Sequence, residues 1–179
     1  KVILFGDSLM AGYGLPNEQH LSVVLQKSLE FDGHNIEIIN GSVSGSTSAG
    51  GLNIAEWTLS ENNIDLMILC LGANDMLRGI NPKETKNNLE EIIEIAKNKN
   101  IKVIIAGMIA PTSYGYAYKK SFDKIFSDLS KKYKLQLIPF LLEGVAQKPE
   151  FNLSDGMHPN DQGTIIIGNT LKKAILENL

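Results

Sequence analysis

Two short segments at opposite ends of the chain contain the residue types of one catalytic site. Ser8 lies in FGDSL, residues 5–9, directly after an apolar run, and His158 lies in DGMHP, residues 155–159. Asp155 precedes the histidine by three residues. A nucleophile, a general base and a carboxylate that orients the base are the parts of a serine-hydrolase triad. We therefore predict Ser8 as nucleophile, His158 as base and Asp155 as the orienting acid.

Each of these segments also has a purely structural explanation when it is considered alone. A serine after a strand is often a helix N-cap or a turn residue, and the Asp-Gly pair at 155–156 would suit a turn that caps the last helix. Packing at a helix start or in a turn explains His20 and His34 adequately. His158 differs because a carboxylate precedes it by three residues and a proline follows it. That spacing can bring the carboxylate onto one ring nitrogen and leave the other for Ser8.

Two further segments could supply hydrogen-bond donors to a developing oxyanion. Acyl transfer places negative charge on the carbonyl oxygen, and fixed donors aimed at that oxygen usually make the largest catalytic contribution. Gly45 lies in a Ser/Gly-rich stretch, residues 41–51, where a backbone N–H can approach a substrate without a side chain in the way. Asn74 offers an amide NH₂, and the N–H of Ser8 is the third candidate donor. Considered alone, 41–51 would suit a flexible loop, and 72–75 an ordinary turn.

Short apolar runs alternate with helical patterns along the chain. The predicted strands are mostly Ile, Leu and Val, as strands buried on both faces should be, and lie at residues 2–5, 36–39, 66–71, 102–106 and 136–138. Apolar residues at helical spacing predict helices at about 21–29, 85–97, 118–133 and 161–176. This order predicts an α/β fold, a flavodoxin-like three-layer α/β/α sandwich with a five-stranded parallel sheet. Because no linker or internal repeat interrupts it, we expect a single domain over residues 1–179.

The predicted sheet decides where the candidate groups meet. In open α/β sheets, ligands bind beyond the carboxyl ends of the strands, near the point where the strand order reverses. Three of the polar or glycine clusters follow a predicted strand directly, and the fourth comes after a short intervening segment; they are residues 6–8, 40–45, 72–75 and 155–158. We therefore expect all four clusters to contribute to one site at one edge of the sheet.

Charge and cysteine content exclude several classes of function. The chain has 17 Lys and Arg against 20 Asp and Glu, a net charge of -3, and Arg78 is its only arginine. This balance argues against nucleic acid or an anionic membrane as the main partner. The longest apolar runs are strand-sized, well below the ~20 residues of a membrane helix, so no stable membrane insertion is expected. Cys70, the only cysteine, excludes an intrachain disulfide and a thiolate zinc cluster, and its apolar surroundings predict a buried thiol.

The four polar segments, taken in order, resemble the signature blocks of the SGNH (GDSL) hydrolase superfamily. The matching blocks are GDSL at 6–9, the Gly45 loop, GAND at 72–75 and DGMHP at 155–159. The resemblance covers essentially the whole chain.

Within that superfamily the chain is most similar to the small bacterial arylesterases and the multifunctional acyl-CoA thioesterase/lysophospholipases. The similarity rests on residues 43–52, on LRG at 77–79 and on LIPF at 137–140. Ser46 departs from this subgroup, which often has an aspartate there. The departure concerns the stability of the loop and not the catalytic groups.

The resemblance implies hydrolysis of carboxylic ester or thioester bonds by Ser8, His158 and Asp155, with Ser8 N–H, Gly45 N–H and the Asn74 side chain as oxyanion hole. It implies no cofactor and no metal. The expected substrate is a small molecule: an aryl or short-to-medium acyl ester, an acyl-CoA or a lysophospholipid. Export to the periplasm or beyond is also implied, and a removed leader would explain why the chain starts without methionine. The oligomeric state is not predicted.

Apolar residues after the third and fourth strands could bind an acyl group. The candidates for this groove are Met76, Leu77, Met108, Ile109 and Pro111. The tyrosine-rich loop within residues 111–118 could close over a substrate. Core or surface packing explains each of these residues equally well.

Two other functions remain as alternatives. A carbohydrate O-deacetylase could use the same triad, with a short polar pocket in place of an extended apolar groove. A non-catalytic binding module with a flavodoxin-like fold would not need the serine, histidine and oxyanion segments together.

Overall fold

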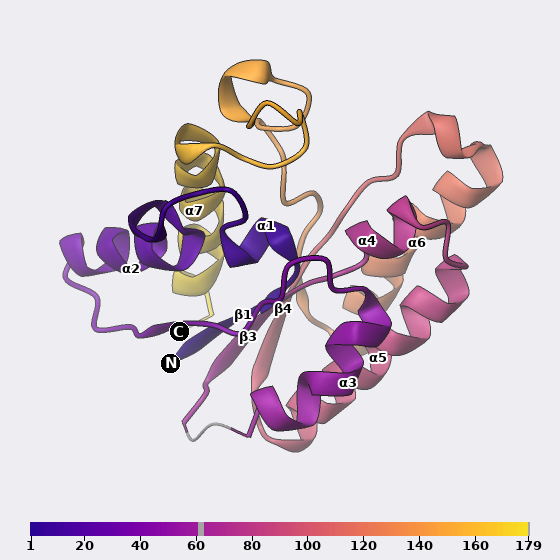
Figure 1. Ribbon diagram of the computed structural model, residues 1–179. Coiled ribbons are helices and arrows are strands. Elements are labelled where there is room, and N and C mark those ends of the chain that lie inside the picture. The colour runs from indigo at the N-terminus through magenta and orange to yellow at the C-terminus, as the bar shows by residue number, and fades with distance from the viewer. Residues whose placement is uncertain (61–62, 179) are drawn as a thin grey trace.

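The computed structural model describes residues 1–60 and 63–178, and its centre is a five-stranded sheet (Figure 1). The strands are β1 (Val2–Gly6), β2 (Ile38–Asn40), β3 (Leu66–Cys70), β4 (Lys102–Ala106) and β5 (Gln136–Ile138). They lie in the order β2-β1-β3-β4-β5, and every neighbouring pair is parallel. The strand order reverses between β1 and β3, so the point where ligands bind in open α/β sheets lies between the ends of these two strands.

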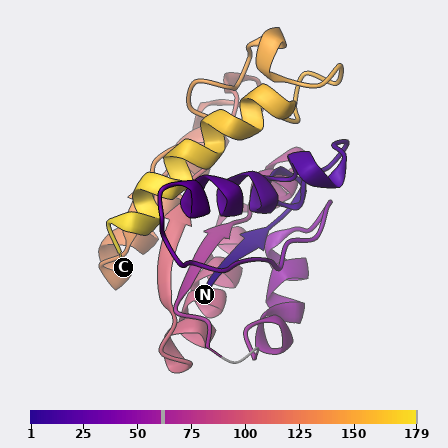
Figure 2. The same ribbon diagram turned by 90° about the vertical axis from the view of Figure 1, so that its left-hand side faces the viewer.

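The central strands are apolar on both faces because helices cover both. Every residue of β1 and of β3 is buried. On one face, α2 (Leu21–Phe31) packs against α7 (Asp161–Leu176), as Figure 2 shows. On the other face lie α3 (Ser48–Thr58), α5 (Pro82–Asn98) and α6 (Tyr116–Tyr133). The predicted three-layer α/β/α fold is confirmed.

Short helices lie in the segments that follow β1, β3, β4 and β5. They are α1 (Ser8–Ala11), α4 (Ala73–Leu77) and the 3₁₀ turns η1 (Asn17–Gln19), η2 (Thr112–Tyr114) and η3 (Pro149–Phe151). Within the described part of the chain, no helix is long and apolar enough to cross a membrane.

Helix α3 was not predicted, because its first turn is rich in serine and glycine, which favour loops. Thr47 caps it by accepting a hydrogen bond from Gly50 N at 3.1 Å. Gly51 is required by close packing: a Cβ at this position would lie 2.3 Å from Cδ1 of Leu71, at the end of β3. The glycine thus lets the helix approach the sheet, which a reading of residue propensities alone does not reveal.

The second strand begins later than predicted, at Ile38 and not at Ile36. The side chain of Gln26, on α2, donates to the Ile36 carbonyl at 2.9 Å and accepts from Ile38 N at 2.7 Å. This amide therefore takes the place of a ladder partner along the first residues of the segment.

Candidate active site

Ser8 stands at a sharp turn from strand to helix. It is the first residue of α1, and Asp7 caps the helix by accepting from Leu9 N at 3.1 Å. Gly12 ends the helix with φ of 84°, a left-handed conformation. Because Asp7 performs the capping, the hydroxyl of Ser8 is not needed for it, and the predicted alternative of Ser8 as the N-cap is wrong.

The histidine contacts both other members of the predicted triad. His158 Nε2 lies 3.0 Å from Ser8 Oγ, and His158 Nδ1 lies 2.6 Å from Asp155 Oδ2. The structure thus brings together a serine and a histidine that are 150 residues apart in the sequence. Both distances are within the range of a hydrogen bond.

Backbone groups keep Asp155 ionised and so decide the proton position on the imidazole. Asp155 Oδ1 accepts from His158 N at 3.0 Å and from Met157 N at 2.9 Å. These two hydrogen bonds, with a further one from the His158 ring, lower the pKa of Asp155 to about 2. A carboxylate only accepts hydrogen bonds, so Nδ1 of the neutral ring donates to it, and Nε2 is left to accept from the Ser8 hydroxyl.

The loop that carries Asp155 and His158 is fixed on both sides. Asn152 and Pro159 form an isolated antiparallel bridge, and Leu153 N donates to the His158 carbonyl at 2.8 Å. The buried Asn152 side chain donates to the carbonyls of Val145 and Lys148. These contacts fix the backbone of the loop and thereby the position of the histidine.

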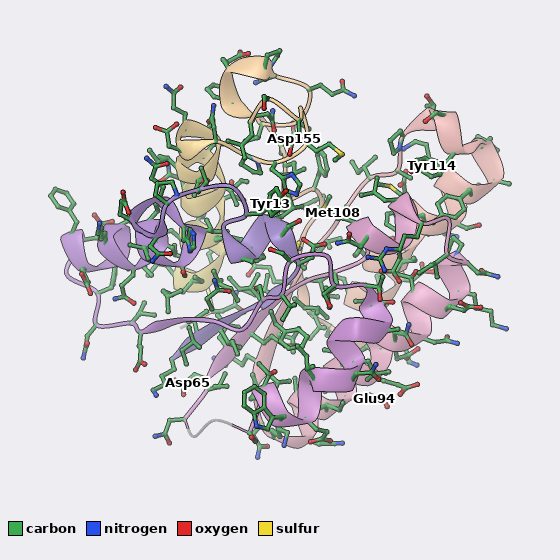
Figure 3. The ribbon with its side chains drawn as sticks, in the orientation of Figure 1. Tyr13, Asp65, Glu94, Met108, Tyr114 and Asp155 are labelled. Carbon is green, nitrogen blue, oxygen red and sulfur yellow. The ribbon has the colours of Figure 1, made fainter. Side chains whose placement is uncertain are left out.

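Tyr13 covers the imidazole from the segment that follows α1. The centroids of the Tyr13 and His158 rings are 4.5 Å apart, and their planes are tilted by 39°. Figure 3 shows Tyr13 close to the loop of Asp155. An aromatic ring in this position restricts rotation of the imidazole.

The amide of Asn74 is oriented by Asp7. Asn74 lies in the first turn of α4, after β3, and its Nδ2 donates to Asp7 Oδ2 at 3.3 Å. One amide hydrogen is used in this bond, so the second can donate to a ligand. The sequence pointed to no contact between Asp7 and Asn74, so this bond is an additional finding.

Gly45 lies in a tight turn attached to the end of β1. Val43 N donates to the Gly6 carbonyl at 3.0 Å, and Ser46 N donates to the Val43 carbonyl at 3.1 Å. Gly45 itself has φ of 79°, which favours glycine. No residue in 1–60 or 63–178 accepts a hydrogen bond from the backbone N–H of Gly45 or of Ser8. Both donors are therefore available to a ligand.

A buried carboxylate connects the two segments that carry Gly45 and Asn74. Asp75 Oδ2 accepts from Ser48 N at 2.7 Å, and Asp75 Oδ1 accepts from the hydroxyls of Ser48 at 2.5 Å and Thr85 at 3.1 Å. Asp75 therefore joins α4 to the starts of α3 and α5. Buried charges are tolerated when they are satisfied in this way.

Burial of Asp7 makes its ionisation costly. The side chain is fully buried, and this desolvation raises the pKa of Asp7 to about 6, although hydrogen bonds from Leu9 and Asn74 lower it. A carboxyl whose pKa is higher in the folded than in the unfolded state stabilises the fold below the unfolded value, near 3.8, and loses that contribution as the pH rises through about 6.

We expect this cost to show in the variant Asp7→Asn. The free energy of unfolding of the wild type, relative to that of Asp7→Asn, should fall by about 2 kcal/mol between pH 4 and pH 7.5, at about 1.4 kcal/mol per pKa unit, because the unfolded carboxyl is already partly ionised at pH 4. Urea unfolding of both proteins at the two pH values measures this difference. A difference that does not change with pH would show that Asp7 titrates as it does in the unfolded chain.

The five residues predicted to bind an acyl group fall into two sets. Met76 and Met108 are almost fully buried and offer little surface to a ligand. Leu77, Ile109 and Pro111 are exposed. A surface cavity of about 510 Å³ lies between the segments after β4 and β5; Ile109 and Pro111 line it, whereas Ser8 and His158 do not.

Two tyrosines of the tyrosine-rich loop pack against the protein, while the other residues of the loop are exposed. Tyr114 stacks on Tyr118 with ring centroids 5.6 Å apart, and the Tyr118 hydroxyl donates to the Ile80 carbonyl at 2.9 Å. Tyr116 is exposed. Figure 3 shows Tyr114 on the side of the molecule away from Tyr13. Packing thus accounts for two of these tyrosines.

Tyr13, Asn152 and Arg78 hold parts of the site in place but were not predicted to do so. Tyr13 contacts the histidine ring, Asn152 holds the loop before it, and Arg78 donates from Nη2 to the Gly45 carbonyl at 3.0 Å. Only weak signals in the sequence pointed to these three roles. Tyr13 follows Ser8 by five residues, and Arg78 is the only arginine and follows Asn74 by one helical turn.

A parallel α/β sheet that carries this group of side chains at its carboxyl edge has the architecture of an α/β serine hydrolase. The GDSL-like lipase/acylhydrolase family matches residues 4–164. An arylesterase from Vibrio mimicus is 35% identical over 179 residues, which is 100% of this chain and 90% of that protein. The thioesterase 1/protease 1/lysophospholipase L1 of Escherichia coli (strain K12) is 30% identical over 174 residues, 97% of this chain and 82% of that protein. Among solved structures, the crystal structure of TesA has a TM-score of 0.93 and 32% identity, with 99% of each chain covered.

The chain therefore belongs to the GDSL-like lipase/acylhydrolase family, the SGNH hydrolases, and is a carboxylic ester hydrolase of that type. The resemblance drawn from the sequence is confirmed.

Proposed function

We propose that Ser8 is the nucleophile of a two-step ester hydrolysis. Its Oγ attacks the acyl carbonyl of the substrate while His158 Nε2 takes the hydroxyl proton. The Oγ–carbon bond forms, and the carbonyl π electrons move onto the oxygen. Asp155 keeps Nδ1 protonated and stabilises the imidazolium that results. The imidazolium then gives its proton to the leaving alcohol or thiol as the carbon–oxygen or carbon–sulfur bond breaks.

The same groups complete the second step. A water molecule attacks the acyl-enzyme while His158 takes its proton, and Ser8 leaves with that proton as the acid is released. Ser8 N–H, Gly45 N–H and the second amide hydrogen of Asn74 stabilise the oxyanion in both steps. Two observations support this assignment of donors: the N–H groups of Ser8 and Gly45 have no acceptor within residues 1–60 and 63–178, and Asn74 is held by its bond to Asp7.

The observation that carries the proposal is the chain of short contacts through His158. Its two ring nitrogens lie 3.0 Å from Ser8 Oγ and 2.6 Å from Asp155 Oδ2. In serine hydrolases a base between a hydroxyl and an ionised carboxylate is the arrangement that activates the hydroxyl.

Aryl esters and esters or thioesters of short-to-medium acyl chains are the proposed substrates. Tyr13, Leu77 and Met157 are about half exposed, and each is close in sequence to a proposed site residue. Such side chains favour an apolar acyl or aryl group over a sugar. The arylesterase and thioesterase/lysophospholipase names of the relatives agree with this substrate class.

Labelling with a fluorophosphonate tests the nucleophile. We expect the folded protein to lose the fluoride of the reagent and to carry one phosphonyl group, which peptide mapping places on Ser8. Heat-denatured protein should take no label, because reactivity requires His158 to be in contact with Ser8. A label on another serine, or none on folded protein, would refute the proposal. On the same preparation, p-nitrophenyl octanoate should be hydrolysed at least as fast as p-nitrophenyl acetate; strong preference for acetate would favour a deacetylase.

A further inference from the structure

Arg78 connects the two segments that supply oxyanion donors. It is the C-cap of α4, one turn after Asn74, and its backbone N–H donates to the Asn74 carbonyl at 3.1 Å. Its guanidinium reaches the other segment, where Nη2 donates to the Gly45 carbonyl at 3.0 Å. One residue therefore bonds to both Asn74 and Gly45, which are 29 positions apart in the printed sequence.

Apart from its backbone hydrogen bonds to Gly6 and Val43, the turn of Gly45 is not held by packing. A Cβ built on Gly45 would have no atom within 4 Å, so the turn is not packed against the protein at that point. Val43, Ser44 and Gly45 are all exposed. A glycine in an unpacked turn has more conformational freedom than any other residue. Hydrogen bonds must therefore provide the order that packing does not.

The arginine completes the restraint on one peptide unit. In the peptide between Gly45 and Ser46, the N–H donates to the Val43 carbonyl and the C=O accepts from Arg78. With both polar atoms held, this peptide cannot flip. The N–H of Gly45, which has no acceptor in the described part of the chain, is then separated from a fixed plane by only two rotatable bonds, the φ and ψ bonds of Gly45 itself.

We propose that Arg78 is a positioning residue that aims the Gly45 N–H at the oxyanion. This inference rests on the proposed function, in which Gly45 is an oxyanion donor. A pre-oriented donor lowers the barrier of the chemical step because it does not have to reorganise as charge develops. Arg78 acts through Gly45 and does not itself touch the substrate.

The test compares Arg78→Met with Lys83→Met, a matched control. Lys83 is also exposed, carries the same charge and lies in the first turn of the neighbouring helix α5. For Arg78→Met we expect kcat to fall about tenfold to a hundredfold, with KM within about twofold of wild type and the melting temperature unchanged. The kcat of Arg78→Lys should lie between the values of wild type and of Arg78→Met, because a lysine keeps one charged donor. Lys83→Met should behave as wild type.

Several results would overturn the inference. An unchanged kcat for Arg78→Met would show that the turn is ordered without the arginine. An equal loss in Lys83→Met would assign the effect to overall charge. A rise in KM with kcat unchanged would place Arg78 in substrate binding.

The rate of phosphonylation separates this inference from the proposed function. Phosphonylation of Ser8 also develops charge on an oxygen in the same place, so its rate should fall in Arg78→Met in parallel with kcat. If wild type is labelled at Ser8 and Arg78→Met reacts at the full rate, only the role of Arg78 is refuted. If wild type is not labelled at all, the proposed function itself is wrong. Asn74→Ala, which removes a proposed donor, shows the size of a complete loss.

Discussion

Replacing Ser8 with alanine is expected to lower kcat by about 10⁶ without unfolding the protein. Removal of a nucleophile from a serine hydrolase has an effect of this order, and the residual rate comes from binding and the oxyanion hole. Within residues 1–60 and 63–178, His158 is the one hydrogen-bond partner of the Ser8 hydroxyl, and Asp7 caps helix α1, so the fold loses little support. We expect the free energy of unfolding to change by less than about 1 kcal/mol.

Hydrolysis of p-nitrophenyl esters and urea unfolding of the same sample measure the two effects. Ser127→Ala is a suitable control, because this partly exposed serine on α6 also has a hydrogen-bonded hydroxyl but is remote in the fold from His158. A Ser8→Ala protein with more than about 1% of wild-type kcat would mean that another group attacks the ester.

Replacing Asp155 with asparagine is expected to lower kcat by about 10⁴. The side-chain oxygen of an asparagine can still accept from Met157 N and His158 N, the two donors that Asp155 satisfies. Its NH₂ group then faces His158 Nδ1, which must accept. The ring is thereby forced into the tautomer with the proton on Nε2, and it can no longer take the proton of Ser8.

NMR of the imidazole nitrogens would show this change of tautomer directly, and ester hydrolysis would show its consequence. Asp161→Asn is the matched control, because Asp161 is an exposed aspartate in the first turn of α7, close in sequence to the same histidine. A near-normal rate for Asp155→Asn would mean that another group orients His158.

The elements with strong periodicity could be predicted from the sequence, often to the residue. Strands β4 and β5 and helix α7 have the predicted bounds, and the other long predicted helices differ by up to three residues at their ends. In these elements, the residues that form the apolar pattern are the ones that the fold buries. Helix α3 escaped prediction because its first turn contains Gly50 and Gly51, which local propensity assigns to a loop. Close packing against Leu71 overrides that preference, and packing between distant residues leaves no local pattern.

The candidate site likewise divides into residues that local motifs predict and residues that only long-range packing brings into place. Ser8, His158 and Asp155 could be predicted because each lies in a short motif with a chemical meaning, and the structure brings them into contact. The groups that hold them could not. Asp7 bonds to Asn74 across 67 positions, and Arg78 bonds to Gly45 across 33. Such bonds depend on how elements pack, and sequence spacing does not encode them.

The long separation of Ser8 and His158 has a consequence for biosynthesis. Ser8 follows the first strand of the sheet, whereas His158 and helix α7 follow the last. A ribosome adds roughly 5–20 residues per second, so the serine exists for several seconds before its histidine is made. During that time the nascent chain has the proposed nucleophile without its proposed base, and we expect it not to attack esters around it. Ester hydrolysis in a translation reaction would therefore count only chains that have been extended past His158, and prematurely terminated products would be silent.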